Sequence, residues 1–246
     1  MSADVATPPM PQTDLHTADP SPERPRVGLF LVPAHLRRAP LADAASWHGL
    51  DPHRVAWLIR HYTRAGDVVL DLDAHPSVAR AARYLHRHPA IVVADGDTHR
   101  VRLTGVRARP TRVRRLTEAG VSLLLAGLPQ PGGDRLGLHA LTEATHQWRR
   151  LVRPGGFVLT VLAPAPPQPG RVSRRSTVIA AARAAGLRYH QHLPALLVPL
   201  PATEPRTDPA TAADTRPALL DGRHALIHLD VLAFRSTTTD QEATDA

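Results

Sequence analysis

The segment "GDVVLDLDAHPSVARAARYLHRHP" (residues 66–89) carries the clearest fold signal of this 246-residue chain. Its short apolar run at 68–72 is typical of a strand buried on both faces of a parallel sheet. Residues 76–88 place Val78, Ala82 and Leu85 at helical spacing, which predicts a helix with one buried face. The turn "DAHPS" between them contains no glycine, the residue that lets a backbone approach a ligand closely. The segment therefore predicts a strand–turn–helix unit of the kind that holds nucleotide cofactors, but with an unusual turn.

The rest of the chain alternates predicted strands and helices. Helices are expected at 51–67, where Asp51 is a candidate N-cap, from 140 to a turn at "RPGG" (153–156), and at 174–189. Strands are expected at 26–34, 68–72, 90–95, 121–129, 157–163, 192–200 and 223–236. This order predicts an α/β, Rossmann-like fold with a mostly parallel seven-stranded sheet that ends in an antiparallel hairpin.

Composition suggests how the chain is divided. Residues 1–26 are rich in Pro, Thr, Asp and Ala and are expected to form a disordered N-terminal tail. A single domain is predicted over 27–236, interrupted by a flexible insertion at 201–222. The polar residues 237–246 are expected to form a disordered C-terminal tail.

The residue inventory narrows the classes of function. The chain has no cysteine, so it has no disulfide, thiolate metal site or cysteine nucleophile. Its 15 histidines show no spacing typical of metal ligands, and no metal is predicted. No apolar run approaches the roughly 20 residues of a membrane span, and the N-terminus does not resemble a secretory signal. A cytoplasmic protein without membrane contact is expected.

The chain is strongly basic, with a formal net charge of +8, and all 30 of its basic residues are arginine. Arginines crowd the stretch 99–115, where Arg112, Arg114 and Arg115 are candidate contacts to DNA or another nucleic acid. The alternative is an ordinary solvated surface, because the absence of lysine indicates a general bias toward arginine. Trp47, Trp57 and Trp148 are expected to pack in the core.

Three segments together resemble the S-adenosylmethionine-dependent methyltransferase superfamily. They are "PHRVAWLIRHYTRAGDVVLDL" (52–72), "RRLVRPGGFVLTVL" (149–162) and "HALIHLDVLAFRS" (224–236). The first and last are most similar to the DNA amino-methyltransferases that modify N4 of cytosine or N6 of adenine. The resemblance spans about residues 47 to 236. It implies a Rossmann-like methyltransferase fold, S-adenosylmethionine as cofactor and a nucleic-acid methyl acceptor.

The resemblance also implies a cofactor site at the strand ends. Asp71 matches the acidic residue that closes the family's first strand, and Asp73 and Ala74 occupy its glycine-rich loop. Asp95, at the end of the next strand, matches the acid that accepts hydrogen bonds from a ribose diol. Two alternatives remain open, because Asp71 could instead cap the following helix and Asp95 could be a solvated strand-end acid.

The family's catalytic motif, Asp/Asn/Ser-Pro-Pro-aromatic, falls on residues that lack its chemistry. The matching positions are Ala126, Gly127, Leu128, Pro129 and Gln130, where only the second proline is kept. The polar side chain that holds the target amino group and the aromatic ring that stacks on the flipped base are both absent. The catalytic residues are therefore unknown. We expect either a catalytically impaired methyltransferase-like protein, a non-catalytic pseudoenzyme that binds nucleic acid or protein, or a subunit that pairs with an active homologue.

Overall fold

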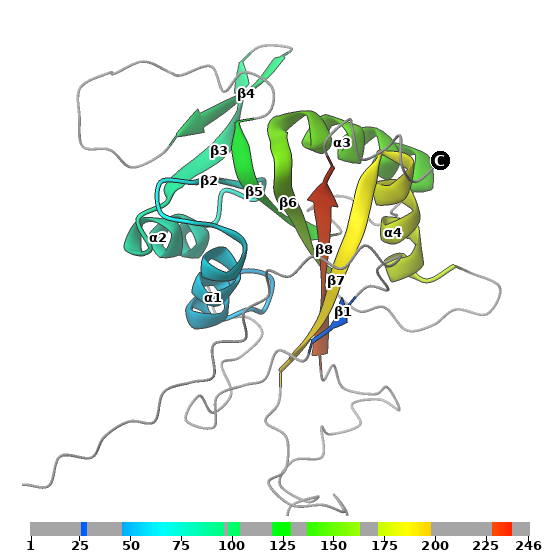
Figure 1. Cartoon of the computed structure of the whole chain (residues 1–246), viewed down its shortest axis with the longest axis horizontal. Coiled ribbons are helices and arrows are strands. Elements are labelled where there is room, and N and C mark those ends of the chain that lie inside the picture. The colour runs from blue at the N-terminus through cyan, green and yellow to red at the C-terminus, as the bar shows by residue number, and fades with distance from the viewer. Residues whose placement is uncertain are drawn as a thin grey trace, which may run out of the picture.

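The computed structural model describes residues 26–28, 46–95, 98–103, 120–128, 137–162, 172–197 and 228–237. Their strands form one eight-stranded mixed sheet in the order β1-β7-β8-β6-β5-β2-β3-β4 (Figure 1). The strands are β1 (Arg26–Val27), β2 (Val68–Asp71), β3 (His88–Asp95), β4 (Thr98–Leu103), β5 (Val121–Leu128), β6 (Val152–Leu162), β7 (Leu187–Leu196) and β8 (His228–Ser236). The helices are α1 (Pro52–Tyr62), α2 (Pro76–Tyr84), α3 (Leu138–Leu151) and α4 (Arg174–Ala184). The predicted insertion and, apart from residues 26 and 237, the predicted tails lie outside the described residues.

The strand pairing confirms the predicted α/β class. β2 pairs in parallel with β3 and with β5, and β5 pairs in parallel with β6. β8 lies antiparallel between β6 and β7, which is the predicted hairpin ending. The predicted count of seven strands is wrong, because β4 pairs antiparallel with β3 at the sheet edge. Its sequence alternates Arg100 and Arg102 with Val101 and Leu103, a pattern suited to an edge strand that the high charge obscured.

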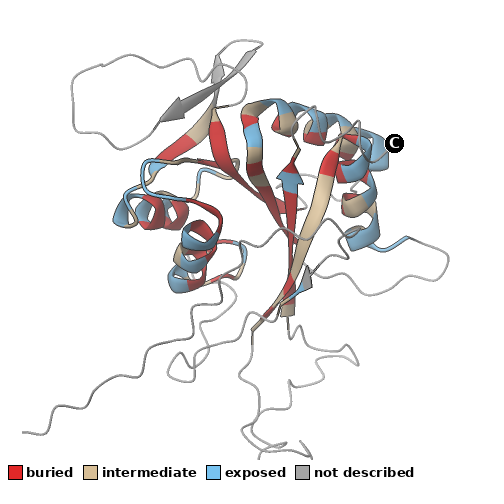
Figure 2. Ribbon diagram, viewed as in Figure 1, coloured by how far each residue is buried: buried red, intermediate tan, exposed pale blue. Residues whose placement is uncertain are grey.

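Two hydrophobic cores lie on opposite faces of the sheet. Side chains of β2 and β5 alternate between them, so that Val69 and Leu123 belong to one core and Leu70 and Leu124 to the other. α1 and α2 cover the first face, and α3 and α4 cover the second (Figure 1). The buried sides of all four helices turn toward the sheet in Figure 2. This three-layer arrangement leaves the ends of the strands as the places where polar groups can gather.

Three local predictions are corrected. The first helix begins at Asp51 as expected, since the Asp51 side chain accepts from His53 N and Arg54 N, but it ends at Tyr62 and not at Gly66. The "RPGG" sequence is not a turn, because β6 already begins at Val152 and the chain passes straight from α3 into it. A register irregularity between Val121 and Leu123 accommodates this direct entry.

The tryptophans do not all share one role. Trp47 and Trp148 are buried, as predicted, but Trp57 is 41% exposed on α1 and its predicted place in the core is wrong. Residues 54, 55, 58, 59 and 62 form the buried side of that helix. Trp57 falls on the opposite side of the 3.6-residue repeat. None of the described helices is long and apolar enough to cross a membrane.

Candidate functional site

The topology points to the ends of β2 and β5 as the candidate site. From β2 the chain adds β3 on one side, while β5 lies on the other and leads on to β6. Open α/β sheets bind ligands in the crevice beyond the carboxyl ends of the strands at such a switch point. The residues that follow Asp71 and those at the end of β5 therefore line the position at which a ligand is expected.

Asp71 holds the turn that follows β2. Its Oδ1 accepts a hydrogen bond from Asp73 N at 3.0 Å, and its Oδ2 accepts one from His75 N at 2.6 Å. The side chain is buried, and burial raises the pKa of Asp71 to about 6, against the opposing effect of the two backbone N–H groups. Of the two alternatives, Asp71 does not cap α2. The N-cap is His75, whose Nδ1 accepts from Ser77 N.

The turn adopts a conformation that glycine would favour without containing one. Ala74 has a φ of +52°, in the left-handed region that is unfavourable for residues with a Cβ. The Asp71 carboxylate bonds to the backbone on both sides of this residue, at Asp73 and His75. The aspartate thus stabilises a conformation that the sequence of the turn opposes.

Asp73 is the centre of a polar cluster that joins three segments. Its Oδ2 accepts hydrogen bonds from Trp47 Nε1 at 3.0 Å and from Gly127 N at 2.9 Å, and lies 2.8 Å from His48 Nε2. The Asp73 side chain is 12% exposed and that of His48 is 31% exposed. We call Trp47, His48, Asp73 and Gly127 the Asp73 cluster. It connects the turn after β2 to the end of β5 across the switch point.

A tight hairpin presents Trp47 and His48 to the cluster. Trp47 and Leu50 exchange two backbone hydrogen bonds of 2.9 Å, and both residues are fully buried. His48 and Gly49 between them have φ values of +50° and +87°, which is the pattern of a type I′ turn. The two anchored ends fix the His48 ring over the crevice.

Gly127 provides the bare backbone against which the His48 ring lies. A Cβ added to Gly127 would come within 1.8 Å of His48 Nε2. In a nucleotide-binding crevice such a close approach to glycine is made by the ligand. In this chain the closely approaching group is a side chain of the protein itself.

The electrostatics of the cluster favour an ionised Asp73. Burial alone raises the pKa of Asp73, but the hydrogen bond and charge of His48 and the donors of Gly127 and Trp47 outweigh it, so the pKa lies below its ordinary value. Burial lowers the pKa of His75, and the neighbouring His48 adds to that effect. A neutral His75 ring is consistent with its Nδ1 accepting from Ser77 N.

The structure brings together only some of the residues predicted from the sequence. Asp71, Asp73 and Ala74 lie in the turn, and Ala126, Gly127 and Leu128 form the buried end of β5. Asp95 is the last residue of β3, and its side chain is outside the described part. Pro129, Gln130, Arg112, Arg114 and Arg115 also lie outside the described residues.

Sequence reasoning missed Trp47 and His48. The available signal was the dipeptide His48-Gly49 before the helix, because histidine and glycine tolerate positive φ better than most residues. Nothing in the sequence paired this dipeptide with Asp73, which is 25 residues away. Among the described residues, no group of three metal-ligating side chains could hold an ion.

The residues present do not fit S-adenosylmethionine as they stand. The crevice backbone at Gly127 is covered by His48, and its N–H donates to Asp73. At the start of α2, Ser77 N is capped by His75 and Pro76 has no N–H, so these two positions offer a ligand no backbone donor. The described part of the crevice is saturated by the chain's own groups.

No family model matches the chain, and no curated protein sequence matches it. Solved structures with a similar fold include geranyl diphosphate C-methyltransferase from Streptomyces coelicolor A3(2), with 16% identity over 87% of this chain and 94% of that chain and a TM-score of 0.48. The [4+2]-cyclase SpnF has 13% identity over 82% and 87% of the two chains, with a TM-score of 0.46. A protein from Thermus thermophilus assigned as a DNA modification methylase has 16% identity over 52% and 53%, with a TM-score of 0.33. Similarity at this level assigns neither activity nor ligand to this chain.

Proposed function

We propose that the chain is a methyltransferase-like protein of the S-adenosylmethionine-dependent superfamily, of the DNA amino-methyltransferase type, with impaired catalysis. The class follows from the motifs at 52–72, 149–162 and 224–236 and agrees with the parallel sheet and antiparallel ending. S-adenosylmethionine is the proposed ligand class of the crevice. Several solved structures of similar fold contain it or its demethylated product.

The observation that supports impairment is the set of bonds to Asp73. A ligand that used the backbone at Gly127 would have to displace His48 and take over or break the Gly127–Asp73 bond. Removing a partner from a buried hydrogen bond typically costs about 1–3 kcal/mol per unsatisfied group. Ligand binding must therefore work against the Asp73 cluster, and weak binding is expected.

The acceptor side supports the same proposal. Ala126, Gly127 and Leu128 carry no polar side chain and no aromatic ring, and all three are buried in β5. These residues could not orient an exocyclic amine for attack on a methyl group. The proposed catalytic impairment thus has two independent supports, one at each half of the crevice.

A non-catalytic module on the same fold is the second proposal, because the net charge of +8 favours a polyanionic partner. Arg112, Arg114 and Arg115 remain its candidate contacts. A gel shift with DNA at several salt concentrations, repeated after all three arginines are changed to alanine, tests this role. Loss of a salt-dependent shift in the variant would support it, and an unchanged shift would contradict these three residues as contacts.

Calorimetry with S-adenosylmethionine and S-adenosylhomocysteine tests the main proposal. The unmodified protein should bind in the millimolar range or more weakly, whereas Asp73→Gly and His48→Ala should each bind at least tenfold more tightly, because they open the Asp73 cluster. Glu143→Ala, on the exposed side of α3, is the matched control and should behave like the unmodified protein.

Two outcomes would contradict the proposal in different ways. Micromolar binding by the unmodified protein would show that the cluster does not block the crevice. No binding by any folded variant, with melting temperatures measured in parallel, would remove S-adenosylmethionine as the ligand class.

A further inference from the structure

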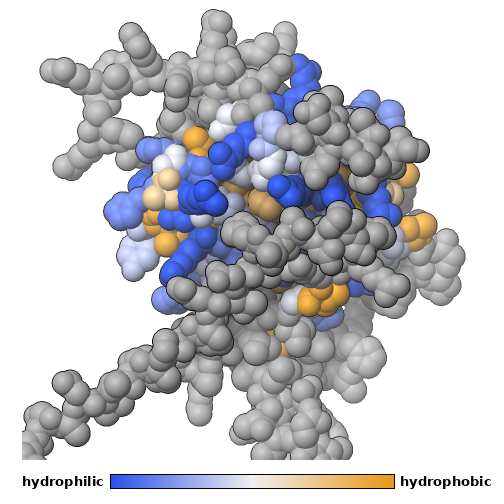
Figure 3. Space-filling model, viewed as in Figure 1, coloured by the Kyte–Doolittle hydropathy of each residue, from blue (hydrophilic) through white to orange (hydrophobic). Residues whose placement is uncertain are grey.

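The outer surface of α1 and α2 combines basic and aromatic side chains. Trp57 and Arg60 on α1 and Arg64 just after it are exposed, and on the neighbouring α2, Arg80, Arg83 and Tyr84 are exposed. We call these six residues the α1–α2 outer face. Figure 3 shows strongly hydrophilic side chains over this side of the molecule, on the left of the view.

Helical geometry places these residues on one side of each helix. Trp57, Arg60 and Arg64 follow one another at intervals of three and four residues, and Arg83 and Tyr84 lie three and four positions after Arg80. The opposite sides of both helices are buried in the core. Because α1 and α2 pack against each other on the same face of the sheet, their exposed sides form one surface (Figure 2).

This surface carries positive charge without compensating acids. Neither α1 nor α2 contains an aspartate or glutamate. The nearest carboxylates are already engaged, since Asp51 caps α1 and contacts Arg54, while Asp67 pairs with Arg153. Within the described part of the chain, no carboxylate forms an ion pair with any of the four arginines of the outer face.

The aromatic side chains distinguish this surface from the other basic regions. Of the aromatic residues that the structure describes, only Trp57 and Tyr84 are exposed, at 41% and 80%. On the opposite side of the sheet the exposed large apolar residues are Leu138 and Val172, which are aliphatic. The Trp57 ring is stacked on His61, with centroids 4.7 Å apart and planes 8° apart, so its orientation is fixed in advance.

We propose that the α1–α2 outer face binds single-stranded nucleic acid, with Trp57 stacking on an unpaired base and the arginines contacting phosphates. Arginine forks match phosphate geometry, and aromatic rings give stacking partners to bases of any sequence. A duplex offers the same phosphates but no free base faces, so an aromatic surface selects the single strand. The inference does not rest on the proposed function, because the outer face lies on the solvent side of α1 and α2 and needs no cofactor.

The direct test uses the intrinsic fluorescence of tryptophan during titration with oligo(dT) and oligo(U). Trp47 and Trp148 are buried, so quenching by the oligonucleotide should report on Trp57. Quenching should be absent in Trp57→Phe, while a labelled oligonucleotide still binds to that variant. Trp57→Ala should weaken binding of the labelled strand about tenfold, the effect expected for loss of one base stack.

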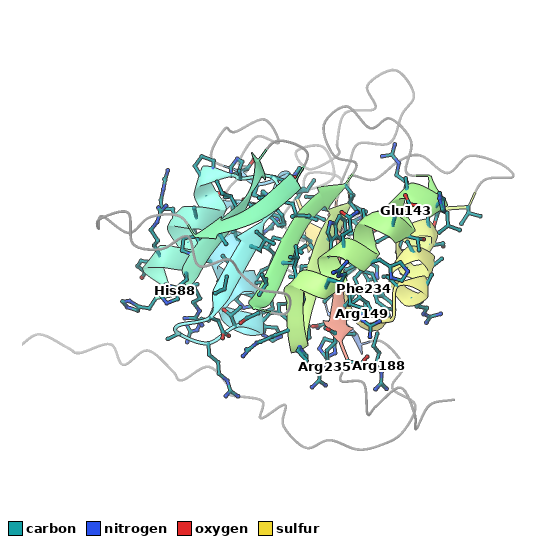
Figure 4. The ribbon with its side chains drawn as sticks, turned by 90° about the horizontal axis from the view of Figure 1, so that it is seen from above. His88, Glu143, Arg149, Arg188, Phe234 and Arg235 are labelled. Atoms are coloured by element: carbon teal, nitrogen blue, oxygen red, sulfur yellow. The ribbon has the colours of Figure 1, made fainter. Side chains whose placement is uncertain are left out.

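A pair of double variants separates this face from charge in general. Arg60→Ala with Arg64→Ala should weaken binding about tenfold and lower the slope of log affinity against log salt by about 1.4, for two phosphate contacts. The control is Arg183→Ala with Arg235→Ala, which removes the same charge elsewhere. Both control residues are exposed, and Figure 4 shows Arg235 near Arg149 and Arg188, far from His88 at the β3 edge. The control should retain its affinity.

Three results would overturn the inference. The first is equal weakening by the two double variants, which would indicate unspecific attraction to a basic protein. The second is a duplex that competes as well as the single strand of equal length. The third is binding that leaves Trp57 fluorescence unchanged. None of these measurements involves S-adenosylmethionine, so its binding and this inference can fail separately.

Discussion

The Asp73 cluster and the α1–α2 outer face are both polar, but they use their polar groups in opposite ways. In the cluster one carboxylate oxygen lies within hydrogen-bond distance of three donors, and the groups around it are largely buried. On the outer face four arginines and two aromatic rings are exposed to solvent. Buried polar groups stabilise a fold only when they are satisfied internally, whereas exposed ones contribute little to stability and stay available to a partner. The difference suggests that ligand binding in this chain has moved from the crevice to the helices.

The largest expected effect comes from removing the acceptor of the cluster. Asp73→Ala leaves Trp47 Nε1 and Gly127 N without their acceptor, and each buried unsatisfied donor costs about 1–3 kcal/mol, so the free energy of unfolding should fall by about 4 kcal/mol. Denaturant unfolding at pH 7 measures it. Glu143→Ala, which removes an exposed pair with His139, should change it by less than about 0.5 kcal/mol. A small loss for Asp73→Ala would mean that the cluster does not contribute to stability.

The next effect concerns the pH dependence caused by Asp71. Because burial raises its folded-state pKa to about 6, above the unfolded value, the folded protein binds a proton more tightly than the unfolded chain. This contribution to stability is fully present below about pH 4 and is lost as the pH rises through 6. The stability of the unmodified protein relative to Asp71→Asn should therefore fall by about 3 kcal/mol over that range, for a shift of about two pKa units. A pH-independent difference would show that Asp71 titrates normally.

Gly127 gives a smaller effect, which should depend on His48. Gly127→Ala should destabilise the protein by about 2 kcal/mol, because the new methyl group and the His48 ring cannot occupy the same space. In a His48→Gly background the same change should cost less than about 0.5 kcal/mol, since distant or removed partners no longer couple. A double-mutant cycle from urea unfolding measures this coupling. Equal costs in both backgrounds would contradict the close packing of His48 on Gly127.

One substitution in the turn should stabilise the protein. Ala74 has a positive φ, which costs a residue with a Cβ about 1 kcal/mol relative to glycine, so Ala74→Gly should raise the free energy of unfolding by up to about 1 kcal/mol. Thermal and urea unfolding should agree on the direction. A destabilised Ala74→Gly variant would mean that the flexibility gained by the unfolded chain outweighs the relief of strain.

The smallest expected effect lies on the outer face. Arg60→Ala together with Arg64→Ala should change the free energy of unfolding by less than about 0.5 kcal/mol, because both side chains are exposed and neither has an ion-pair partner in the described part of the chain. The same variant is expected to lose affinity for single strands. A large loss of stability would remove the contrast between the two regions.

Local patterns in the sequence were sufficient for most of the framework. Apolar runs predicted β2 and β5, the 3.6-residue repeat predicted α1, and the two final strands without a helix between them predicted the antiparallel ending. Prediction failed where charge or a turn motif hid the pattern. β4 lies in an arginine-rich stretch, and the glycines of "RPGG" lie within β6, because its pairing with β5 and β8 overrides their tendency to form a turn.

Residue identities alone establish that the turn after β2 has no glycine and that the positions of the family's catalytic motif have no suitable side chain. They also establish the excess of arginine. The folded arrangement was needed to find that Asp73 bonds to Trp47, His48 and Gly127, and that Trp57 is exposed beside the arginines of the outer face. Hydrogen-bond partners and surface patches are set by distances in space. Asp73 is separated from Trp47 by 26 positions and from Gly127 by 54 positions along the chain, and no local periodicity records such separations.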